Sequence, residues 1–463
     1  MHVTMIGAGY VGLVSGACFA EFGHRVTCVD KDVERTAALG RGEIPIFEPG
    51  LADLVTANVR QGRLRFAMKP TALGEADAVF IAVGTPSRRG DGHADLSFVY
   101  DAVREIAPLL SRTAIVVTKS TVPVGTGDEI ERILREKRPD AEMQVVSNPE
   151  FLREGAAIHD FKHPDRIVVG TDDARARGVL AEIYRPLYLN AAPMLYVSRR
   201  TAELIKYAAN AFLATKITFI NEIADLCERV GADVQEVARG MGLDNRIGAK
   251  FLHAGPGFGG SCLPKDTTAL LKTAHDHGAQ LRIVETVSAV NAQRKRMMAR
   301  KVVAALDGSI RGKTIAVLGL TFKPNTDDMR DAPSIPLIVA LHDLGATVRS
   351  YDPIGIEQAK PHLPDVTYCN SAYAAAEGAH AVVIVTEWEQ FRALDLERLR
   401  CVMAQPVIVD LRNIYRADEM KRANFRYIAV GRPSAERRAE SVMPRRRKAA
   451  SGKAKSAELA EAL

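Results

Sequence analysis

Residues 1–12 read Met1-His2-Val3-Thr4-Met5-Ile6-Gly7-Ala8-Gly9-Tyr10-Val11-Gly12, and this stretch determines how the first part of the chain folds. His2–Ile6 predicts a short strand, and the glycine-rich turn behind it predicts a helix that continues through Phe22. A second strand is predicted at Arg25–Val29; it ends in Asp30, 18 residues beyond the last of these glycines. In a dinucleotide-binding βαβ unit the glycines admit a pyrophosphate to the helix N-terminus, and the acidic residue binds the ribose hydroxyls. We therefore predict a Rossmann-like domain, and Asp30 favours NAD over NADP.

Three further strands are predicted in this domain, at Ala78–Val83, Ala114–Thr118 and Gln144–Ser147. Each apolar run ends in a polar, turn-forming segment, and in an open α/β sheet these carboxyl ends line the crevice where ligands bind. The residues behind them that could serve a site are Thr121, Glu150 and Glu154. The same residue types make ordinary caps and turns, so position alone leaves both interpretations open.

A long helix is predicted from about Arg200 to Val230, where Gly231 ends it. At ~1.5 Å per residue its length is about 45 Å, which suits a connection between two domains and a contribution to a dimer interface. Lys206 and Asn210 lie four residues apart and share one face of this helix. They form either a solvent-facing stripe or a cation and an amide aimed together at an oxyanion.

A second α/β unit begins near Arg311, with strands predicted at Thr314–Leu318, Thr347–Tyr351, Ala381–Val385 and Val407–Asp410. Its first turn, Gly319-Leu320-Thr321-Phe322-Lys323, lacks the glycine pattern of the first unit, which indicates a different phosphate ligand. Lys323 and Arg412 lie near predicted strand ends, where they could meet negative charge.

The predicted fold class is α/β, with two Rossmann-like doubly wound parallel-sheet domains joined by a long central helix. We expect an NAD-binding domain at residues 1–199 and a central helical and dimerisation region at 200–310. A C-terminal α/β domain follows at 311–431, and a basic disordered tail at 432–463.

The segment Gly257-Phe258-Gly259-Gly260-Ser261-Cys262-Leu263-Pro264-Lys265-Asp266 lies in the central region. Its glycines permit close approach of a ligand to the backbone. The Cys262 thiol is a nucleophile only as thiolate, a form that the Lys265 cation favours, and Asp266 could take or relay a proton. The alternative interpretation is a structural glycine loop around a buried thiol.

The net charge of +6 is concentrated at the C-terminal end. Residues 432–463 contain nine Lys and Arg residues against four Asp and Glu, a net charge of +5. Such a segment buries too little apolar surface to fold alone, and no aromatic residue interleaves its basic ones, so we expect a solvated appendage rather than nucleic-acid binding.

The remaining composition predicts a cytoplasmic protein without disulfides or a metal site. No apolar run approaches the ~20 residues that span a bilayer, and strand-like sequence begins too early to leave room for a signal peptide. The six cysteines are scattered without a C-x-x-C pair. His275 and His277 are two residues apart, which places them on different helix faces, so we expect no metal ligands there.

Several of these motifs together resemble the nucleotide-sugar dehydrogenases of the UDP-glucose/GDP-mannose dehydrogenase family. The resemblance spans roughly residues 1–431, in the family's order, and rests on Gly7–Gly12, Thr121–Thr126, Asn148–Gly155, Gly257–Asp266 and Phe322–Asp331. Leu263 departs from the phenylalanine that often follows the family's cysteine. The resemblance implies NAD-dependent four-electron oxidation of UDP-glucose to UDP-glucuronate.

The resemblance also implies residue roles. Cys262 would attack the aldehyde stage to form a thiohemiacetal, whose oxidation gives a thioester that water hydrolyses. Lys206 and Asn210 would steady the oxyanion, Glu150 would act on the hydrolytic water, and Asp266 with Thr121 would position a water during the first oxidation.

Two sets of binding residues follow from the same resemblance. NAD would be held by Gly7, Gly9, Tyr10, Val11, Gly12, Asp30, Arg35, Thr85, Thr121, Glu154, Lys265 and Arg330. The residues that would hold the UDP-sugar are Glu150, Phe151, Leu152, Arg153, Glu154, Lys206, Asn210, Phe251, Leu252, His253, Ala254, Gly255, Gly259, Phe322, Lys323 and Arg412. Arg246 would reach the site from the partner subunit of a homodimer.

Three alternatives remain open at this stage. Sister enzymes oxidise GDP-mannose or UDP-N-acetylmannosamine with much the same residues, although Asp331-Ala332-Pro333-Ser334-Ile335 favours the UDP-glucose branch. A one-step 3-hydroxy acid dehydrogenase needs neither Cys262 nor residues 311–431. A non-catalytic NAD-binding regulator would have lost the reactive side chains, which are all present here.

Overall fold

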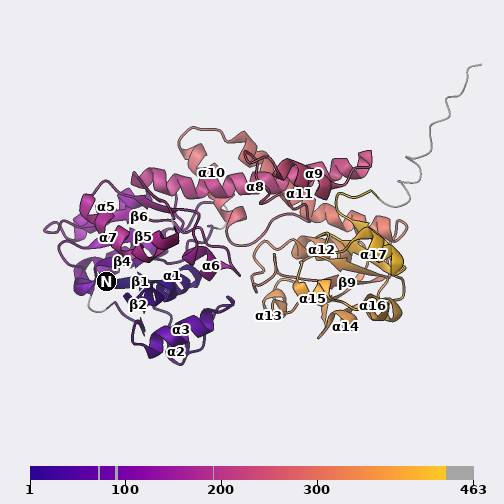
Figure 1. The fold of residues 1–463 in the computed structure, drawn as a ribbon, viewed down its shortest axis with the longest axis horizontal. Coiled ribbons are helices and arrows are strands. Elements are labelled where there is room, and N and C mark those ends of the chain that lie inside the picture. Colours follow the sequence, from indigo (N-terminus) through magenta and orange to yellow (C-terminus); the bar gives the residue numbers. More distant parts are fainter. Residues whose placement is uncertain (71–72, 89–91, 191, 434–463) are drawn as a thin grey trace, which may run out of the picture.

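A long helix, α8 (Arg199–Val230), lies across two α/β lobes, with α9 (Val234–Gly242), α10 (Leu263–Asp276) and α11 (Arg282–Ala305) alongside it (Figure 1). The computed structural model describes residues 1–70, 73–88, 92–190 and 192–433. Helix α8 packs against the N-terminal sheet at β6 and β7, and against α10 and α11. The predicted fold class, two Rossmann-like sheets joined by a long central helix, is therefore confirmed.

The N-terminal lobe is built on an eight-stranded sheet of order β3-β2-β1-β4-β5-β6-β7-β8. Its strands are β1 (His2–Ile6), β2 (Arg25–Val29), β3 (Leu64–Ala67), β4 (Ala78–Ile81), β5 (Ile115–Thr118), β6 (Gln144–Ser147), β7 (Ile167–Gly170) and β8 (Met194–Val197). Its helices are α1 (Tyr10–Glu21), α2 (Val33–Gly40), α3 (Leu51–Arg60), α4 (Ser97–Ile106), α5 (Thr126–Lys137), α6 (Ala157–Lys162) and α7 (Ala174–Ile183), with short 3₁₀ turns at Leu73–Glu75, Ala107–Leu109 and Arg185–Asn190.

The strands from β3 to β6 in the sheet order, β3-β2-β1-β4-β5-β6, all run parallel. This direction was predicted for those of them that the sequence identifies. The sheet then reverses, because β7 pairs with β6 in the antiparallel direction through Ser147 and Gly170. Strands β4 and β5 are fully buried on both faces, since helices cover the sheet from either side. Their carboxyl ends consequently open toward the junction with the rest of the molecule.

The C-terminal lobe repeats this architecture in a six-stranded parallel sheet of order β11-β10-β9-β12-β13-β14. Its strands are β9 (Thr314–Leu318), β10 (Thr347–Tyr351), β11 (Thr367–Tyr368), β12 (Ala381–Ile384), β13 (Val407–Asp410) and β14 (Arg426–Ala429). Its helices are α12 (Ser334–Asp343), α13 (Ile356–Ala359), α14 (Ala372–Ala376), α15 (Glu389–Arg392), α16 (Leu396–Val402) and α17 (Ala417–Arg422).

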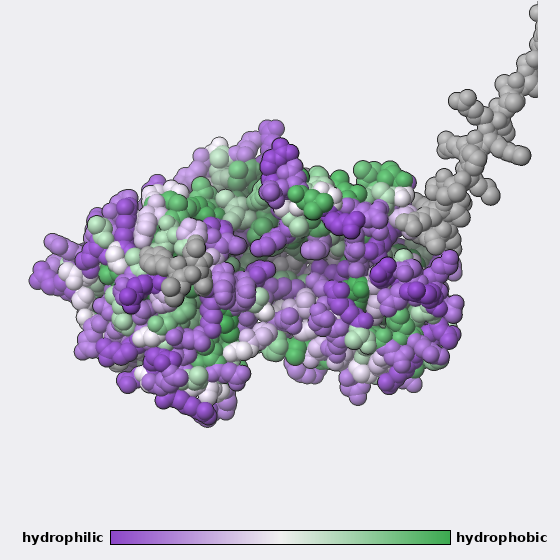
Figure 2. Space-filling model, in the orientation of Figure 1, coloured by the Kyte–Doolittle hydropathy of each residue, from purple (hydrophilic) through white to green (hydrophobic). Residues whose placement is uncertain are grey.

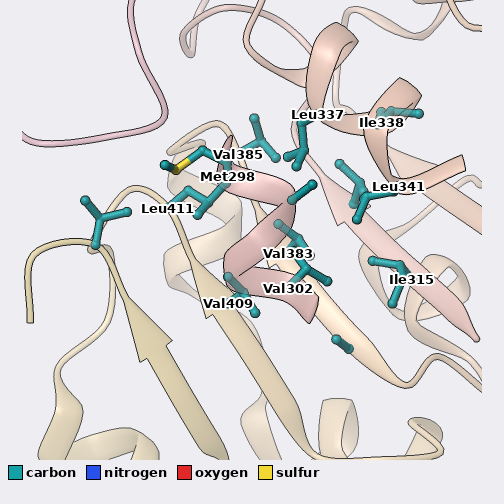
Figure 3. Close-up of a cluster of buried hydrophobic side chains, with 14 of the residues drawn as sticks. Met298, Val302, Ile315, Leu337, Ile338, Leu341, Val383, Val385, Val409 and Leu411 are labelled. Atoms are coloured by element: carbon teal, nitrogen blue, oxygen red, sulfur yellow. The ribbon is translucent and has the colours of Figure 1, made fainter. Parts of the chain in front are cut away.

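Helix α11 is part of the core of the C-terminal lobe. Met298 and Val302 of this helix pack against α12 and against the sheet, as Figure 3 shows. The buried partners that the figure labels are Ile315, Leu337, Ile338, Leu341, Val383, Val385, Val409 and Leu411. Because α11 also packs on α8 and α10, the loop that precedes α10 is held in a defined position between the lobes.

The predicted tail falls almost entirely on residues 434–463, outside the described residues. Arg432 is described, and it is bound to the folded protein: Nε lies 3.2 Å from Asp233 Oδ2, and Nη2 donates to Gln235 Oε1 at 2.6 Å. No helix among residues 1–70, 73–88, 92–190 and 192–433 is long and apolar enough to cross a membrane.

Candidate active site

The cysteine segment forms a tight turn that packs against the C-terminal lobe and leads into α10. The Gly260 N–H donates to the carbonyl oxygen of Arg330 at 2.8 Å. Gly260 has a φ of +85°, and a Cβ on it would lie 2.6 Å from the Phe322 ring. A Cβ on Gly259 would lie 2.3 Å from the carbonyl oxygen of Asp331. Only glycine allows this turn and this closeness, and the turn places Cys262 at the N-cap of α10, directly before its first residue.

The thiol of Cys262 is partly shielded, and burial raises its pKa, as does the carboxylate of Glu150. The Lys206 ammonium opposes this rise, as does a hydrogen bond with the Ser261 hydroxyl. The prediction that Lys265 favours the thiolate is wrong for this arrangement: Lys265 Nζ lies 3.3 Å from Asp266 Oδ1 and donates to Thr85 Oγ1 at 3.2 Å. The cation that acts on the sulfur comes instead from α8.

Lys206 and Asn210 point into the protein, so a solvent-facing stripe is excluded. Lys206 Nζ lies 3.2 Å from Glu150 Oε1. Asn210 Nδ2 donates to Asp266 Oδ2 at 2.6 Å. One turn of α8 thus holds a carboxylate from the end of β6 and a carboxylate from the first turn of α10, both beside the thiol.

Thr85 and Thr121 join the ends of β4 and β5 to this cluster. Thr85 Oγ1 donates to the carbonyl oxygen of Thr121 at 2.9 Å and accepts from Lys265 Nζ. The chain of contacts therefore runs from the carboxyl edge of the N-terminal sheet through Lys265 to Asp266, as expected for residues at the crevice of an α/β sheet.

The glycine-rich turn between β1 and α1 leaves room for a pyrophosphate. A Cβ on Gly12 would lie 1.9 Å from the carbonyl oxygen of Gly7, whereas no atom lies within 4 Å of a Cβ on Gly9. The α1 N-terminus has no side-chain cap, so its backbone N–H groups are available to an anion. Asp30 Oδ2 accepts from the Ala8 N–H at 2.8 Å and from Arg35 Nη1 at 3.1 Å, which places the carboxylate at the ribose position. The residues present fit NAD.

Glu154 lies where the N-terminal lobe meets the cysteine turn. Ser261 Oγ donates to Glu154 Oε1 at 2.8 Å, and Arg330 Nη2 lies 3.3 Å from the same oxygen. Burial, with the nearby Asp328 carboxylate, raises the pKa of Glu154 to about 7. This carboxyl group is therefore poised between its charged and neutral forms near neutral pH.

A second half of the site faces the C-terminal lobe. The Phe151 ring lies 4.0 Å from the guanidinium of Arg166 and 5.3 Å from Lys206 Nζ. Lys323 is half-buried beside Phe322, and partial desolvation lowers its pKa. Arg412 donates to the carbonyl oxygens of Val385 at 2.7 Å and of Phe322 at 3.1 Å.

Hydrogen bonds to side chains of two helices, α8 and α11, fix the loop 251–255. The Gly255 N–H donates to Asn221 Oδ1 of α8 at 2.8 Å, and its carbonyl oxygen accepts from Arg294 Nε of α11 at 2.7 Å. A Cβ on Gly255 would lie 3.2 Å from Arg412 Nη1. Within this loop Leu252 and Ala254 are buried, whereas His253 is exposed.

Two predicted binding residues pair with neighbouring carboxylates in the single chain. Arg246 is 90% exposed in its side chain and pairs with Asp244 at 2.7 Å. Arg153 pairs with Asp160 at 2.6 Å.

Two buried polar residues, Glu48 and Lys119, shape the site although no motif marks them. Glu48 accepts from the Tyr10 hydroxyl, from the Gly155 N–H at 2.6 Å and from the Ala157 N–H at 2.8 Å, which ties the glycine-rich turn to the Glu154 loop. Lys119 donates to Asn148 Oδ1 at 3.1 Å and to the Tyr184 hydroxyl at 3.0 Å. The signal for Lys119 was a lysine directly after an apolar strand, whereas Glu48 carried none. Ser261 lies within the cysteine segment, but nothing in that segment predicted its contact with Glu154.

The described residues contain no group of three or more His, Cys, Asp or Glu side chains arranged to hold a metal ion.

Three family models match the chain, all of the UDP-glucose/GDP-mannose dehydrogenase family. Residues 1–188 match the NAD binding domain, residues 200–293 the central domain, and residues 316–417 the UDP binding domain.

Among individual proteins, the chain is 65% identical to the UDP-glucose 6-dehydrogenase of Rhizobium meliloti (strain 1021), over 94% of this chain and all of that protein. It resembles the structure of a UDP-glucose dehydrogenase from the archaeon Pyrobaculum islandicum, with a TM-score of 0.86, 40% identity, and coverage of 93% and 98% of the two chains. A UDP-D-ManNAc dehydrogenase from Pyrococcus horikoshii is similar in fold at 26% identity, with a TM-score of 0.81 and coverage of 93% and 99%.

Proposed function

The chain belongs to the UDP-glucose/GDP-mannose dehydrogenase family, and on that premise we propose that it oxidises UDP-glucose to UDP-glucuronate with NAD. The observation that carries the proposal is the cluster around Cys262, in which Lys206, Asn210, Glu150 and Asp266 meet between the two lobes. A thiol, a buried cation and paired carboxylates in one place are the parts that a four-electron oxidation of an alcohol requires.

The N-terminal lobe supplies the cofactor site. The α1 N-terminus would receive the pyrophosphate and Asp30 would bind the ribose, and Thr85, Thr121 and Lys265, near the strand ends, would also hold the cofactor. NAD, when bound there, accepts a hydride from the substrate carbon in each of the two oxidations. We assign this domain to residues 1–199, the central region to 200–310 and the UDP-sugar domain to 311–431.

In the first oxidation the substrate hydroxyl loses a proton while its carbon loses a hydride. Asp266 accepts a hydrogen bond from Asn210 and holds, with Thr121, the water that takes the proton. Lys206 Nζ and Asn210 Nδ2 project from one face of α8, so they donate together to the oxygen on which negative charge develops.

In the second oxidation the Cys262 thiolate attacks the aldehyde carbon, and the resulting thiohemiacetal oxygen is held by Lys206 and Asn210. Loss of a hydride from that carbon leaves a thioester. Glu150 then takes a proton from the attacking water, the C–S bond breaks, and the carboxylate is released. The 3.2 Å separation of Glu150 Oε1 from Lys206 Nζ supports this role, since it places the base beside the group that binds the oxyanion.

The sugar nucleotide would lie between the lobes. Phe151 to Glu154 and the loop 251–255 enclose the sugar, whereas Phe322, Lys323 and Arg412 face the diphosphate and base from the carboxyl ends of the C-terminal strands. The diphosphate would give the half-buried cation of Lys323 a negative partner in addition to the Glu154 and Asp160 carboxylates near it.

We assign the assembly as a homodimer that forms through α8. Phe212, Phe219 and Leu226 lie seven residues apart on one face of this helix and are 65%, 46% and 52% exposed. Figure 2 shows green hydrophobic residues along the upper edge of the molecule, where Figure 1 places α8 and α9. Arg246, which follows α9, would then extend toward the partner's site.

UDP-glucose is preferred over GDP-mannose and UDP-N-acetylmannosamine because identity is far higher to a UDP-glucose 6-dehydrogenase than to a UDP-D-ManNAc dehydrogenase. The test is a spectrophotometric screen of all three sugar nucleotides with NAD, using wild-type protein and Cys262→Ala. We expect NADH with UDP-glucose alone, and a loss of turnover by orders of magnitude in the variant. Uronate production at a near-normal rate by Cys262→Ala would contradict the assignment of the nucleophile.

We infer the cellular compartment from the cysteines and the absence of a nucleic-acid partner from the distribution of charge. The six cysteines all lie in the described part of the chain and are free, which supports a reducing cytoplasm. Nucleic acid is not among the proposed partners, because the net positive charge is concentrated in residues 432–463, where no aromatic residue interleaves the basic ones.

A further inference from the structure

We propose that Ser261 relays the proton of the Cys262 thiol to Glu154, which makes Ser261 a catalytic residue of the second oxidation. The inference rests on the proposed function, in which Cys262 is the nucleophile. It adds the route by which a thiol that burial keeps protonated becomes a thiolate.

The three groups form a continuous line. Ser261 Oγ lies 3.5 Å from Cys262 Sγ and 2.8 Å from Glu154 Oε1. A hydroxyl accepts one proton while it donates another, so it joins the thiol to the carboxylate without a change of geometry. The turn that carries Ser261 is fixed by the hydrogen bond of the Gly260 N–H to Arg330, which keeps this line in place.

Glu154 has the capacity to accept the proton. Its Oε2 atom is buried and has no hydrogen-bond partner among the described residues. Burial, with the nearby Asp328 carboxylate, raises the pKa of Glu154 to about 7. Protonation of Glu154 therefore removes a charge from a site that disfavours it.

The thiolate, in contrast, is stabilised where it forms. The Lys206 ammonium and a hydrogen bond from the Ser261 hydroxyl both lower the pKa of Cys262, against the larger effects of burial and Glu150. After transfer, Ser261 Oγ–H donates to the thiolate and Glu154 donates to Ser261 Oγ. The relay moves negative charge from a carboxylate that is buried beside Asp328 to a sulfur beside a lysine.

The transfer balances without an added reactant. The S–H bond breaks, its electron pair stays on sulfur for the attack on the aldehyde carbon, and one proton is added to Glu154. When the thioester is hydrolysed, the departing thiolate recovers that proton through Ser261. Each turnover thus returns Glu154 to its starting charge.

Other charged groups face the two ends of the relay. Those around the thiol are Glu150, Lys206, Asp266, Lys323 and Arg330, and those around Glu154 are Tyr10, Lys323, Asp328 and Arg330. Glu150 is paired with Lys206, and Asp266 with Asn210 and Lys265. In the described part of the chain, Glu154 is the carboxylate joined to Sγ through a hydroxyl.

The test is the rate at which iodoacetamide alkylates Cys262 in the ligand-free full chain, followed by mass spectrometry of the labelled peptide from about pH 5 to about pH 10. Coupled groups titrate in two steps, so the wild type should show two inflections. Glu154→Gln should show one, because an amide accepts no proton. Ser261→Ala should also show one, displaced upward by about one pH unit, which is about a tenfold slower reaction at neutral pH. Ser261→Thr keeps the hydroxyl and should restore both inflections.

Two inflections in Glu154→Gln or in Ser261→Ala would overturn the relay, as would a single inflection in the wild type. Both substitutions are small, and thermal unfolding confirms that each variant is folded. The readout requires no turnover, so it separates the relay from the proposed reaction: failure of wild-type protein to form NADH from UDP-glucose would contradict the function whatever the alkylation profile.

Discussion

Lys206 Nζ of α8 and Glu150 Oε1 at the end of β6 form an ion pair of 3.2 Å, with side-chain exposures of only 4% and 6%. The two residues are 56 positions apart in the sequence. Their pairing ties the central helix to the carboxyl edge of the N-terminal sheet. Removal of one partner leaves an uncompensated buried charge.

We therefore predict that Lys206→Met lowers turnover by roughly 10²–10³-fold, because an oxyanion donor is lost. It should also destabilise the fold by about 3–5 kcal/mol, since Glu150 loses the buried partner of its ion pair. Turnover and chemical denaturation report the two effects. In Lys206→Met/Glu150→Gln the stability should recover while the activity does not. A double variant as unstable as Lys206→Met would show that the lost charge pairing is not the cause.

Lys119 predicts a pH-dependent stability. Burial lowers the pKa of its ammonium to about 7. Below that pH the folded and unfolded states are both protonated, and the full destabilisation of the buried charge is present. Between about pH 7 and about pH 10 the unfolded chain binds more protons, so folding stability rises with pH, by at most roughly 1.4 kcal/mol per unit.

Lys119→Met removes this group, so wild type should gain stability relative to the variant as the pH rises from about 7 to about 9. Urea unfolding at several pH values measures the difference, and Lys137→Met, at an exposed position, serves as the matched control. A stability difference between wild type and Lys119→Met that stays constant with pH would refute the prediction.

We predict that residues 433–463 are dispensable for turnover and stability, whereas Arg432 is required for full stability. Deletion of residues 433–463 should leave turnover and thermal stability largely intact, because none of the proposed site residues belongs to this segment. Arg432→Ala should lower the melting temperature, since Arg432 joins the C-terminal lobe to Asp233 and Gln235. Loss of activity in the truncated protein would show that the tail belongs to the site or to the assembly.

The apolar face of α8 should control assembly. Phe212→Asp costs little in the isolated fold because the side chain is 65% exposed, but it should dissociate the dimer, which light scattering would detect. Leu344→Asp, on an exposed residue of the C-terminal lobe, is the matched control and should remain dimeric. A Phe212→Asp protein of unchanged mass would place the interface elsewhere or exclude it.

Local patterns predicted most of the two sheets. Strands β1, β2, β6, β9, β10 and β13 have the bounds expected from their apolar runs and turn signals, and α8 differs by one residue. The strands β3, β7, β8, β11 and β14 were not identified: β8 and β11 are short and largely open to solvent, and an apolar run does not encode its direction in a sheet. The reversal at β7 is therefore visible only in the folded chain.

The sequence predicted most residues of the candidate site but not all of the contacts between their side chains. The i, i+4 spacing of Lys206 and Asn210 was sufficient to place them on one face. Proximity in sequence suggested Lys265 as the cation beside the thiol, whereas packing of α8 against α10 brings Lys206 there. Glu48 and Ser261 act through contacts over 107 residues, to Gly155 and Glu154 respectively, and no local pattern encodes such a distance.

The stoichiometry of the complete reaction tests whether one site performs both oxidations. Wild-type protein is supplied with excess NAD and a limiting amount of UDP-glucose, and NADH and the sugar nucleotides are quantified at completion. We predict two NADH for each UDP-glucose, with UDP-glucuronate as the product, because Cys262 retains the aldehyde stage until it is oxidised. One NADH for each UDP-glucose, with a free aldehyde as the product, would contradict the claim that one site performs both oxidations.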